Sequence, residues 1–425
     1  MASQAANQNV TNRWLIAAAG IIVQLALGAV YAWSVFRATL TEEFSTSVSA
    51  VNTTFSITIL ALGFAAFAGG LWMARVGPRI VVMTAGALYG LGIFLASFSQ
   101  DNIWLLWLTY GLLGGIGIGL GYIVPIATLI KWFPDRRGFI TGLAVAGFGG
   151  GALLTAPIAR YLVGQVGVFT TFAILGIIYL VMVVGAGFFM KNPPEGWKPE
   201  GWEPEEEESS ERSSVDYDLG DALKSWQWYA LWGILFLNVT AGIAIITEAA
   251  PMAQEIAGVD AFVAAGLVSI ISVGNGIGRF VWAWFSDAIG RKGVFITMFL
   301  LQAVLFLLIP LVGASYFLLA ALTFIIVSCY GGGFGTMPAF SGDYFGSANV
   351  GKIYGLMLTA WGFGGVLGPY LISIMYDATR SYQGALYILA GLMLVSSILP
   401  MIIRPPKSPQ ESDVGAQQGA EAQEA

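Results

Sequence analysis

One arginine stands in the middle of a long apolar segment. Arg279 lies within Ser272–Trp282, a stretch that holds no other charged residue. A charged side chain at the centre of a membrane helix costs about 2.5 to 3.5 kcal/mol on insertion scales, so it needs water or an anionic partner. A guanidinium keeps its proton and presents planar donors that match a carboxylate with two hydrogen bonds. The sequence therefore predicts that Arg279 binds a small carboxylate.

Two other roles are open for this arginine. Asp287 lies eight residues further along, so Arg279 could instead reach the membrane surface or form a permanent ion pair. Eight helical residues span about 12 Å, which disfavours the first role. Asn275 lies one turn earlier on the same helix face, where its amide could bind the same carboxylate or bond a neighbouring helix.

The remaining composition excludes several chemistries. The chain has no histidine and one cysteine, Cys329, which removes the commonest metal ligand and any intramolecular disulfide. Gly346–Lys352 resembles a phosphate-binding loop, but the next residue is Ile353 rather than Ser or Thr, and no strand precedes it. We therefore expect no metal, cofactor, nucleotide or nucleic acid, and no enzymatic activity.

Composition places these residues in a lipid bilayer. Of the 425 residues, 57% are hydrophobic and 10% are charged, and the mean hydropathy is +0.75. Soluble domains carry about 25% charged residues. At about 20 residues per crossing, we expect an all-α membrane protein with twelve spans. They begin near Trp14, Val51, Ile80, Ile103, Gly138, Val168, Trp226, Ala261, Gly293, Ser315, Ile353 and Gln383.

Basic residues orient the spans. Fifteen lysines and arginines fall on the side that carries both termini, and three (Arg37, Arg160 and Arg380) fall on the other. Because cytoplasmic loops are rich in Lys and Arg, we expect a multi-pass plasma (inner) membrane protein with both termini in the cytoplasm.

The two halves of the chain repeat at a shift of about 213 residues. Gly70–Arg79 matches Ala283–Lys292, and Gly147–Gly150 matches Gly362–Gly365 with a slip of two. Two six-helix halves of the same orientation form a transporter architecture.

A polar segment separates the halves. Residues 191–225 hold 11 of the 25 acidic residues, with prolines and serines that bury little apolar area. We expect a cytoplasmic tail at 1–13, a first bundle at 14–190, an acidic linker at 191–225, a second bundle at 226–404 and a disordered cytoplasmic tail at 405–425.

The repeated loop resembles the motif of the major facilitator superfamily, in which an acid and basic residues follow the second span. The second copy keeps the acid as Asp287, whereas the first has Ala74. In the superfamily this acid helps to latch the halves. The resemblance therefore implies conformational roles for Asp287, Arg75, Arg79 and Arg291.

A second motif narrows the resemblance. Trp132–Gly147 is similar to the signature of the monocarboxylate transporters and their oxalate/formate antiporter relatives, with Asp135 in place of a lysine. Gly28–Phe36 looks like the oxalate/formate branch. The family places a substrate-binding arginine on the helix of Arg279, and its animal members have aspartate at the position of Asn275.

The resemblance also implies a substrate. The oxalate branch adds a lysine in the middle of span eleven, whereas this chain has only Lys352 there, at the mouth. One central cation suits one carboxylate, so we expect lactate, pyruvate or glycolate rather than oxalate. Polar and aromatic side chains should complete the pocket, although each could equally serve ordinary packing: Tyr330, Phe334, Tyr122, Gln24 and Tyr31.

These observations predict a secondary active transporter of short monocarboxylates that works by alternating access and is coupled to protons. The candidate proton carriers are Glu248 and the substrate itself, and the alternative for Glu248 is an exposed position at the mouth of span seven. An anion exchanger of the oxalate/formate type and a carboxylate sensor without flux are the rival functions.

Overall fold

The computed structural model describes residues 12–194, 197–199, 216–346 and 349–406, without the side chains of 136–139, 141, 350 and 351. Within these ranges twelve helical spans are long and apolar enough to cross a membrane. The predicted spans are thereby confirmed, and each begins within a few residues of its expected position.

Six spans form the first half of the molecule. The first, third, fourth and fifth are built of two or more consecutive segments. The spans are α2 (Arg13–Gly28) with η1 (Ala29–Ala32) and α3 (Ser34–Glu43); α4 (Val48–Val76); α5 (Pro78–Leu95) with η2 (Ala96–Phe98); α6 (Ile103–Leu106) with η3 (Trp107–Gly114) and α7 (Gly115–Trp132); α8 (Arg137–Gly149) with α9 (Gly151–Val166), after η4 (Pro134–Arg136); and α10 (Val168–Gly187).

Six more spans form the second half. They follow a short helix, α11 (Leu219–Lys224). They are α12 (Trp226–Ala257); α13 (Ala261–Ile289); α14 (Arg291–Val312); α15 (Tyr316–Phe345); α16 (Val350–Met357) with α17 (Thr359–Thr379); and α18 (Gln383–Ser396) with α19 (Ile398–Ile402).

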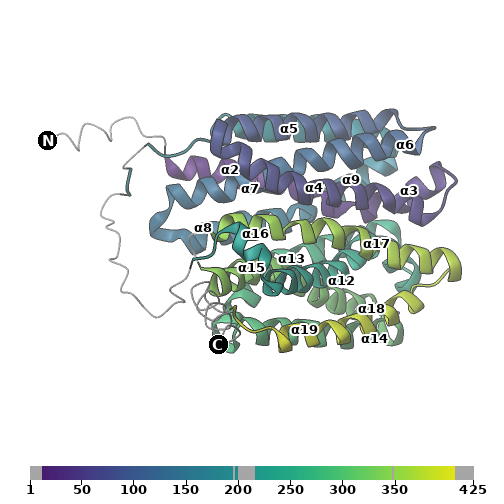
Figure 1. Cartoon of the computed structure of the whole chain (residues 1–425). Coiled ribbons are helices and arrows are strands. Elements are labelled where there is room, and N and C mark those ends of the chain that lie inside the picture. The colour runs from purple at the N-terminus through teal and green to yellow at the C-terminus, as the bar shows by residue number, and fades with distance from the viewer. Residues whose placement is uncertain (1–11, 195–196, 200–215, 347–348, 407–425) are drawn as a thin grey trace, which may run out of the picture.

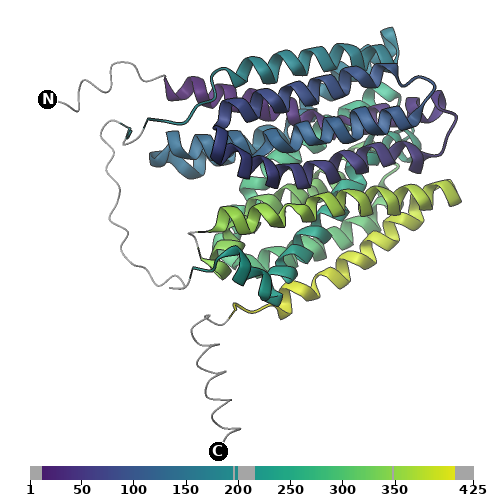
Figure 2. The same cartoon turned by 45° about the horizontal axis from the view of Figure 1, so that its top comes forward.

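The halves lie side by side as two bundles, the first in purple to blue and the second in green to yellow (Figures 1 and 2). Two seams join them: α4 packs on α17, and α13 packs on α8 and α9. In each seam the second span of one half packs on the fifth span of the other half. The two seams are therefore related as a twofold axis requires. The paired helices α5 and α10 lie on the outside of one bundle, and α14 and α18 on the outside of the other.

Close glycine contacts fix the register of the two seams. A Cβ on Gly63 would lie 2.9 Å from the amide nitrogen of Gly362, and a Cβ on Gly149 would lie 2.9 Å from the amide nitrogen of Gly276. Gly63 and Gly276 are 213 residues apart, and so are Gly149 and Gly362. The slip of two inferred for the fifth and eleventh spans is therefore wrong, because their helices repeat at the same shift as the rest.

The repeated loops make the same turn in both halves. Gly77 and Gly290 adopt φ of 81° and 80°, a left-handed conformation that favours glycine, and each separates two consecutive spans. At the other end of α13, the Asp260 carboxyl accepts the amide hydrogens of Phe262 and Val263 at 2.8 and 3.0 Å. These bonds hold the pKa of Asp260 below its ordinary value, because they favour the charged form.

An even number of spans puts the start of α2 and the end of α19 at one end of the molecule, which we call the terminal end. The other end, where α3 finishes and α4 begins, we call the distal end (Figure 1).

Part of the predicted linker is helical and packs on the second half. Just before α11, the Tyr217 amide donates to the Phe345 carbonyl oxygen, and Asn349 donates to the Tyr217 carbonyl oxygen, both at 3.0 Å. Residues 200–215, which carry most of the acidic run, lie outside the described residues, as do 1–11 and the tail from 407 onward.

Candidate functional site

Arg279 lies well inside α13, and glycines allow the neighbouring helix to reach it. A Cβ on Gly278 would lie 2.1 Å from the Ser328 carbonyl oxygen, and a Cβ on Gly335 would lie 2.1 Å from the Arg279 carbonyl oxygen. Only glycine fits such approaches. The backbones of α13 and α15 therefore touch where the arginine enters the protein interior.

The Arg279 side chain is buried, with 3% of its surface exposed. Its Nη1 donates weakly to the Tyr122 hydroxyl at 3.4 Å, and its Cζ lies 5.0 Å from the centre of the Phe334 ring. No carboxylate in the described part of the chain pairs with it, and Nε and Nη2 have no hydrogen-bond partner there. Both alternative roles, an arginine at the membrane surface and a permanent ion pair, are therefore wrong.

Six buried rings, three from each half, surround this position. The Tyr122 ring lies 4.9 Å from Phe148 and 5.2 Å from Trp361, and the Trp361 ring lies 4.9 Å from Phe334. We call the set the aromatic cage: Tyr31, Tyr122, Phe148, Tyr330, Phe334 and Trp361.

A hydroxyl pair links the halves across the cage. The hydroxyls of Tyr31 and Tyr330 lie 2.7 Å apart, and their rings meet edge to face. Tyr31 belongs to η1, where the first span tightens into a 3₁₀ turn between α2 and α3. Mid-helix segments of this kind often mark hinges. The structure thus brings Tyr31, Tyr122, Tyr330 and Phe334, four of the residues predicted to bind substrate, together with Arg279.

Asn275 is buried beside the cage, and neither atom of its amide has a partner among the described residues. It lines a small cavity of about 10 Å³ together with Tyr31 and Ser272. Unpaired buried amides cost free energy, so this amide is available to a bound molecule. The amide lies near the Tyr31 hydroxyl of the other half, and in the described chain it forms no hydrogen bond of ordinary geometry to another helix.

Gln24 lies outside this group. Its Nε2 donates to the Tyr122 carbonyl oxygen at 3.1 Å, so it ties α2 to α7 and supports the helix that carries Tyr122. No contact joins its side chain to Arg279 in the described part of the chain.

Sequence reasoning missed Phe148 and Trp361. Both lie in Gly-rich runs at a separation of 213 residues, so the repeat at its correct register brings them to matching places. The slip of two paired Phe148 with Phe363 instead, and this hid the relation.

Glu248 is buried at the distal end, with 0% of its surface exposed, so the alternative of an exposed mouth residue is wrong. Its carboxylate accepts from Arg37 Nε at 3.0 Å, from Arg37 Nη2, from the Tyr382 hydroxyl at 2.7 Å and from the Asn52 amide. The Asn52 amide also donates to Ser373 Oγ at 2.8 Å. Because Arg37 and Asn52 belong to the first half and the others to the second, this network closes the distal end.

The predicted conformational residues lie at the terminal end and do not cross between halves. Arg291 donates to Asp287 at 2.6 Å and to Asp343 at 3.0 Å, all within the second half. Arg75 and Arg79 are exposed and have no hydrogen bond or ion pair with the residues described. The polar links between halves in the described chain therefore lie at the centre and the distal end.

Two six-helix halves closed around a buried cation form a membrane transporter. The chain matches the family model of the Major Facilitator Superfamily over residues 16–279 and 231–424, and it belongs to that superfamily.

Relatives narrow the comparison and confirm the resemblance predicted from the sequence. The chain is 33% identical over 360 residues to the uncharacterized MFS-type transporter YhjX of Escherichia coli, covering 83% of this chain and 86% of that one. It is 27% identical to the oxalate:formate antiporter of Oxalobacter formigenes (95% and 96% covered) and 26% identical to monocarboxylate transporter 13 of Rattus norvegicus (90% and 86%).

A solved structure shares the fold. It is a bacterial homolog of the human lysosomal transporter Spinster, with a TM-score of 0.66 at 14% identity, covering 93% of this chain and 96% of that one.

Proposed function

We propose that the protein transports short monocarboxylates such as lactate or pyruvate by alternating access, with Arg279 binding the carboxylate. One observation carries the proposal. The two nitrogens of Arg279 without a partner, Nε and Nη2, form one edge of the planar guanidinium. That edge binds a carboxylate through two parallel hydrogen bonds.

The charge of the site supports one carboxylate rather than two. Asn275 supplies an amide and no acid, and Lys352 is exposed at the mouth of the eleventh span. Within the described chain, Arg279 is thus the cation that the cage presents. The aromatic walls suit a short apolar body, as in other pockets for small organic acids.

Uptake into proteoliposomes tests this role. Arg279→Ala should abolish uptake of labelled lactate, and Arg279→Lys should leave a small fraction, because an ammonium is a point charge without the planar pair of donors. Lys352→Ala, which removes an exposed charge outside the cage, is the matched control and should retain uptake. Full activity of Arg279→Ala would refute the proposed site.

Proton coupling is proposed to run through Glu248. Protonation of Glu248 would remove the negative charge that binds Arg37. It would thereby weaken the hydrogen-bond network that closes the distal end. Breaking a buried ion pair by neutralising one partner costs about 3 to 5 kcal/mol, enough to change which end of the carrier is open.

Glu248→Gln separates coupling from transport. The variant should lose uptake driven by a proton gradient and should keep exchange against preloaded lactate, because its amide cannot carry the proton. Glu255→Gln on the same helix removes an exposed carboxylate that accepts from Tyr376, and it should keep both activities. A Glu248→Gln protein that still accumulates lactate would exclude this coupling site.

The same assay distinguishes the rival functions. Flux seen only against a preloaded anion, with oxalate preferred, would favour an exchanger, since one relative of the chain is an oxalate:formate antiporter. Binding of lactate without flux would favour a sensor.

Orientation and gating complete the proposal. We place both termini in the cytoplasm of a plasma-membrane protein, so that Arg75, Arg79, Asp287 and Arg291 lie at the cytoplasmic side and latch the halves when the distal end opens. A reporter enzyme fused after residue 425 should be active only if it is one that functions in the cytoplasm.

A further inference from the structure

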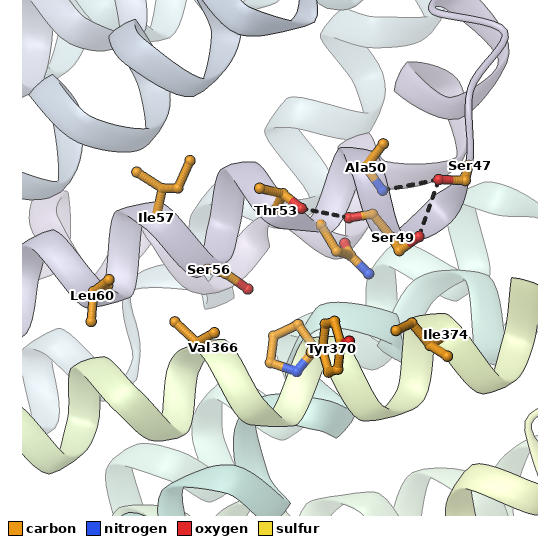
Figure 3. Close-up of a pocket in the computed structure, with 12 residues that line it drawn as sticks. Ser47, Ser49, Ala50, Thr53, Ser56, Ile57, Leu60, Val366, Tyr370 and Ile374 are labelled. Atoms are coloured by element: carbon orange, nitrogen blue, oxygen red, sulfur yellow. Dashed lines mark hydrogen bonds between the residues drawn. The ribbon is translucent and has the colours of Figure 1, made fainter.

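A pocket of about 480 Å³ lies in one of the two seams, between the first half of α4 and α17 (Figure 3). Ser56 on α4 faces Val366 and Tyr370 on α17 across it. Its volume is within the range of pockets that hold small molecules, about 300 to 1,000 Å³. None of its lining residues belongs to the aromatic cage.

In the other seam, two serines form hydrogen bonds from one half to the other. Ser269 donates to the Leu153 carbonyl oxygen at 3.0 Å, and Ser272 donates to that of Gly149 at 2.9 Å. The counterpart of Ser269 in the first half is Ser56, 213 residues earlier. Ser56 makes no hydrogen bond across its seam in the described chain, so the bond that Ser269 forms in the other seam has no counterpart here.

Both ends of the pocket are fixed. At the distal end the Asp377 carboxylate accepts from the amides of Val48 and Ser49, at 3.1 Å each, and from the Ser49 hydroxyl at 2.5 Å. Toward the middle of the membrane, Phe64 and Phe363 meet edge to face at 5.9 Å. The space between is therefore a built cavity and not a gap between loosely packed helices.

Polarity changes along the pocket as it does along a lipid leaflet. From Ser47 to Leu60 the lining of α4 passes from hydroxyls and an amide to Ile57 and Leu60. This stretch is about 20 Å long at 1.5 Å per residue, and one leaflet contributes half of a hydrocarbon core of about 30 Å. Tyr370 and Ile374 on the other wall are exposed on the outer face of the helix. The opening thus faces the bilayer.

The polar end presents acceptors. Ser49 gives its hydroxyl hydrogen to Asp377, and Thr53 gives its own to the Ser49 carbonyl oxygen. Lone pairs of these hydroxyls remain as acceptors, and the negative charge of Asp377 lies directly behind Ser49, which suits a donor with positive charge. An ammonium has three hydrogens to donate.

We propose that this pocket is a site for a membrane phospholipid with a primary ammonium head group, whose acyl chain lies along Ile57, Leu60 and Val366. The inference does not depend on which substrate is carried. Because Asn52 lines the pocket and also bonds Glu248 and Ser373, a lipid seated there supports the closed distal end from behind.

Photolabelling of the full-length protein in liposomes tests the site. The probe is phosphatidylethanolamine with a diazirine in its acyl chain. In the wild type, label should concentrate in peptides of α4 and α17 over those of α9 and α13. Ser56→Phe fills the pocket and should reduce that label about tenfold, a change equal to about 1.4 kcal/mol. Leu91→Phe, at an exposed position on α5, is the control and should not change it.

Two further arms keep the result decisive. Val366→Phe fills the pocket from the opposite wall, so it replaces Ser56→Phe if that protein fails to fold. The matching phosphatidylcholine probe, whose quaternary ammonium has no hydrogen to donate, should label α4 and α17 less. Equal label in both seams, or label unchanged by both filling variants, would overturn the site, and equal label by both lipids would overturn the head-group assignment.

Discussion

At the scale of single residues, the candidate site is marked by buried side chains without hydrogen-bond partners in the described chain. Arg279 and Asn275 sit one helical turn apart, and both keep hydrogen-bonding atoms without partners in a buried place. Such groups are costly unless a ligand satisfies them. Their chemistry could be predicted from the sequence because an arginine in an uncharged span admits few explanations.

Asn275→Asp tests the charge of the site. An acid one turn from Arg279 would pair with the guanidinium and compete with the substrate, so lactate affinity should fall about tenfold near neutral pH. It should recover as the pH falls and the new carboxyl becomes protonated. Asn275→Ala removes the amide without adding charge and should be less harmful. Calorimetric titration of lactate at several pH values checks this, and an unchanged affinity for Asn275→Asp would contradict it.

The burial of Glu248 could not be predicted from the sequence. Its partners Arg37 and Tyr382 are 211 and 134 residues away in the chain, and local patterns carry no information on such pairs. The same holds for Phe148 and Trp361, because an aromatic residue in a Gly-rich span looks alike whether it faces the cage or a neighbouring helix.

At the scale of helices, glycines set how closely the seams pack. Gly63→Ala would bring a methyl group to 2.9 Å from Gly362 and push α4 from α17. Overpacking of this kind costs about 1 to 3 kcal/mol, so the melting temperature should fall. A Cβ at Gly185 on α10 would have no atom within 4 Å. Gly185→Ala should therefore keep or raise the melting temperature, since alanine favours the helix over glycine by about 1 kcal/mol. Thermal unfolding in detergent compares them, and equal stability of the two variants would argue against tight seams.

The spans themselves were predictable for a simple reason. A bilayer demands about 20 apolar residues for each crossing, and this chain interrupts its apolar runs with charged or turn residues. The register of the repeat could not be predicted in the same way, because Gly-rich motifs match at several alignments. The contacts of Gly63 and Gly276 in the structure show which alignment is correct.

At the scale of the whole molecule, Asp377 on α17 couples the halves, because its carboxylate caps the N-terminus of α4 in the other half. Asp377→Asn should weaken its bonds to Val48 and Ser49, and the distal end should open more often. Spin labels at Glu43 and Ala378, one on each half, would report longer distances by pulsed electron resonance. Asp260→Asn, which alters a cap within one half, is the control. Unchanged distances for Asp377→Asn would show that other contacts alone hold this end.

The uncompensated cation in the cage has an electrical consequence. With no ligand bound, the described core around Arg279 carries a positive charge, which a monocarboxylate bound as proposed would cancel. A membrane potential exerts about 2.3 kcal/mol per elementary charge for each 100 mV. Because a proton on Glu248 would leave the charge of Arg37 uncompensated, the loaded and the unloaded carrier would bear the same net charge, and voltage should act on both alike.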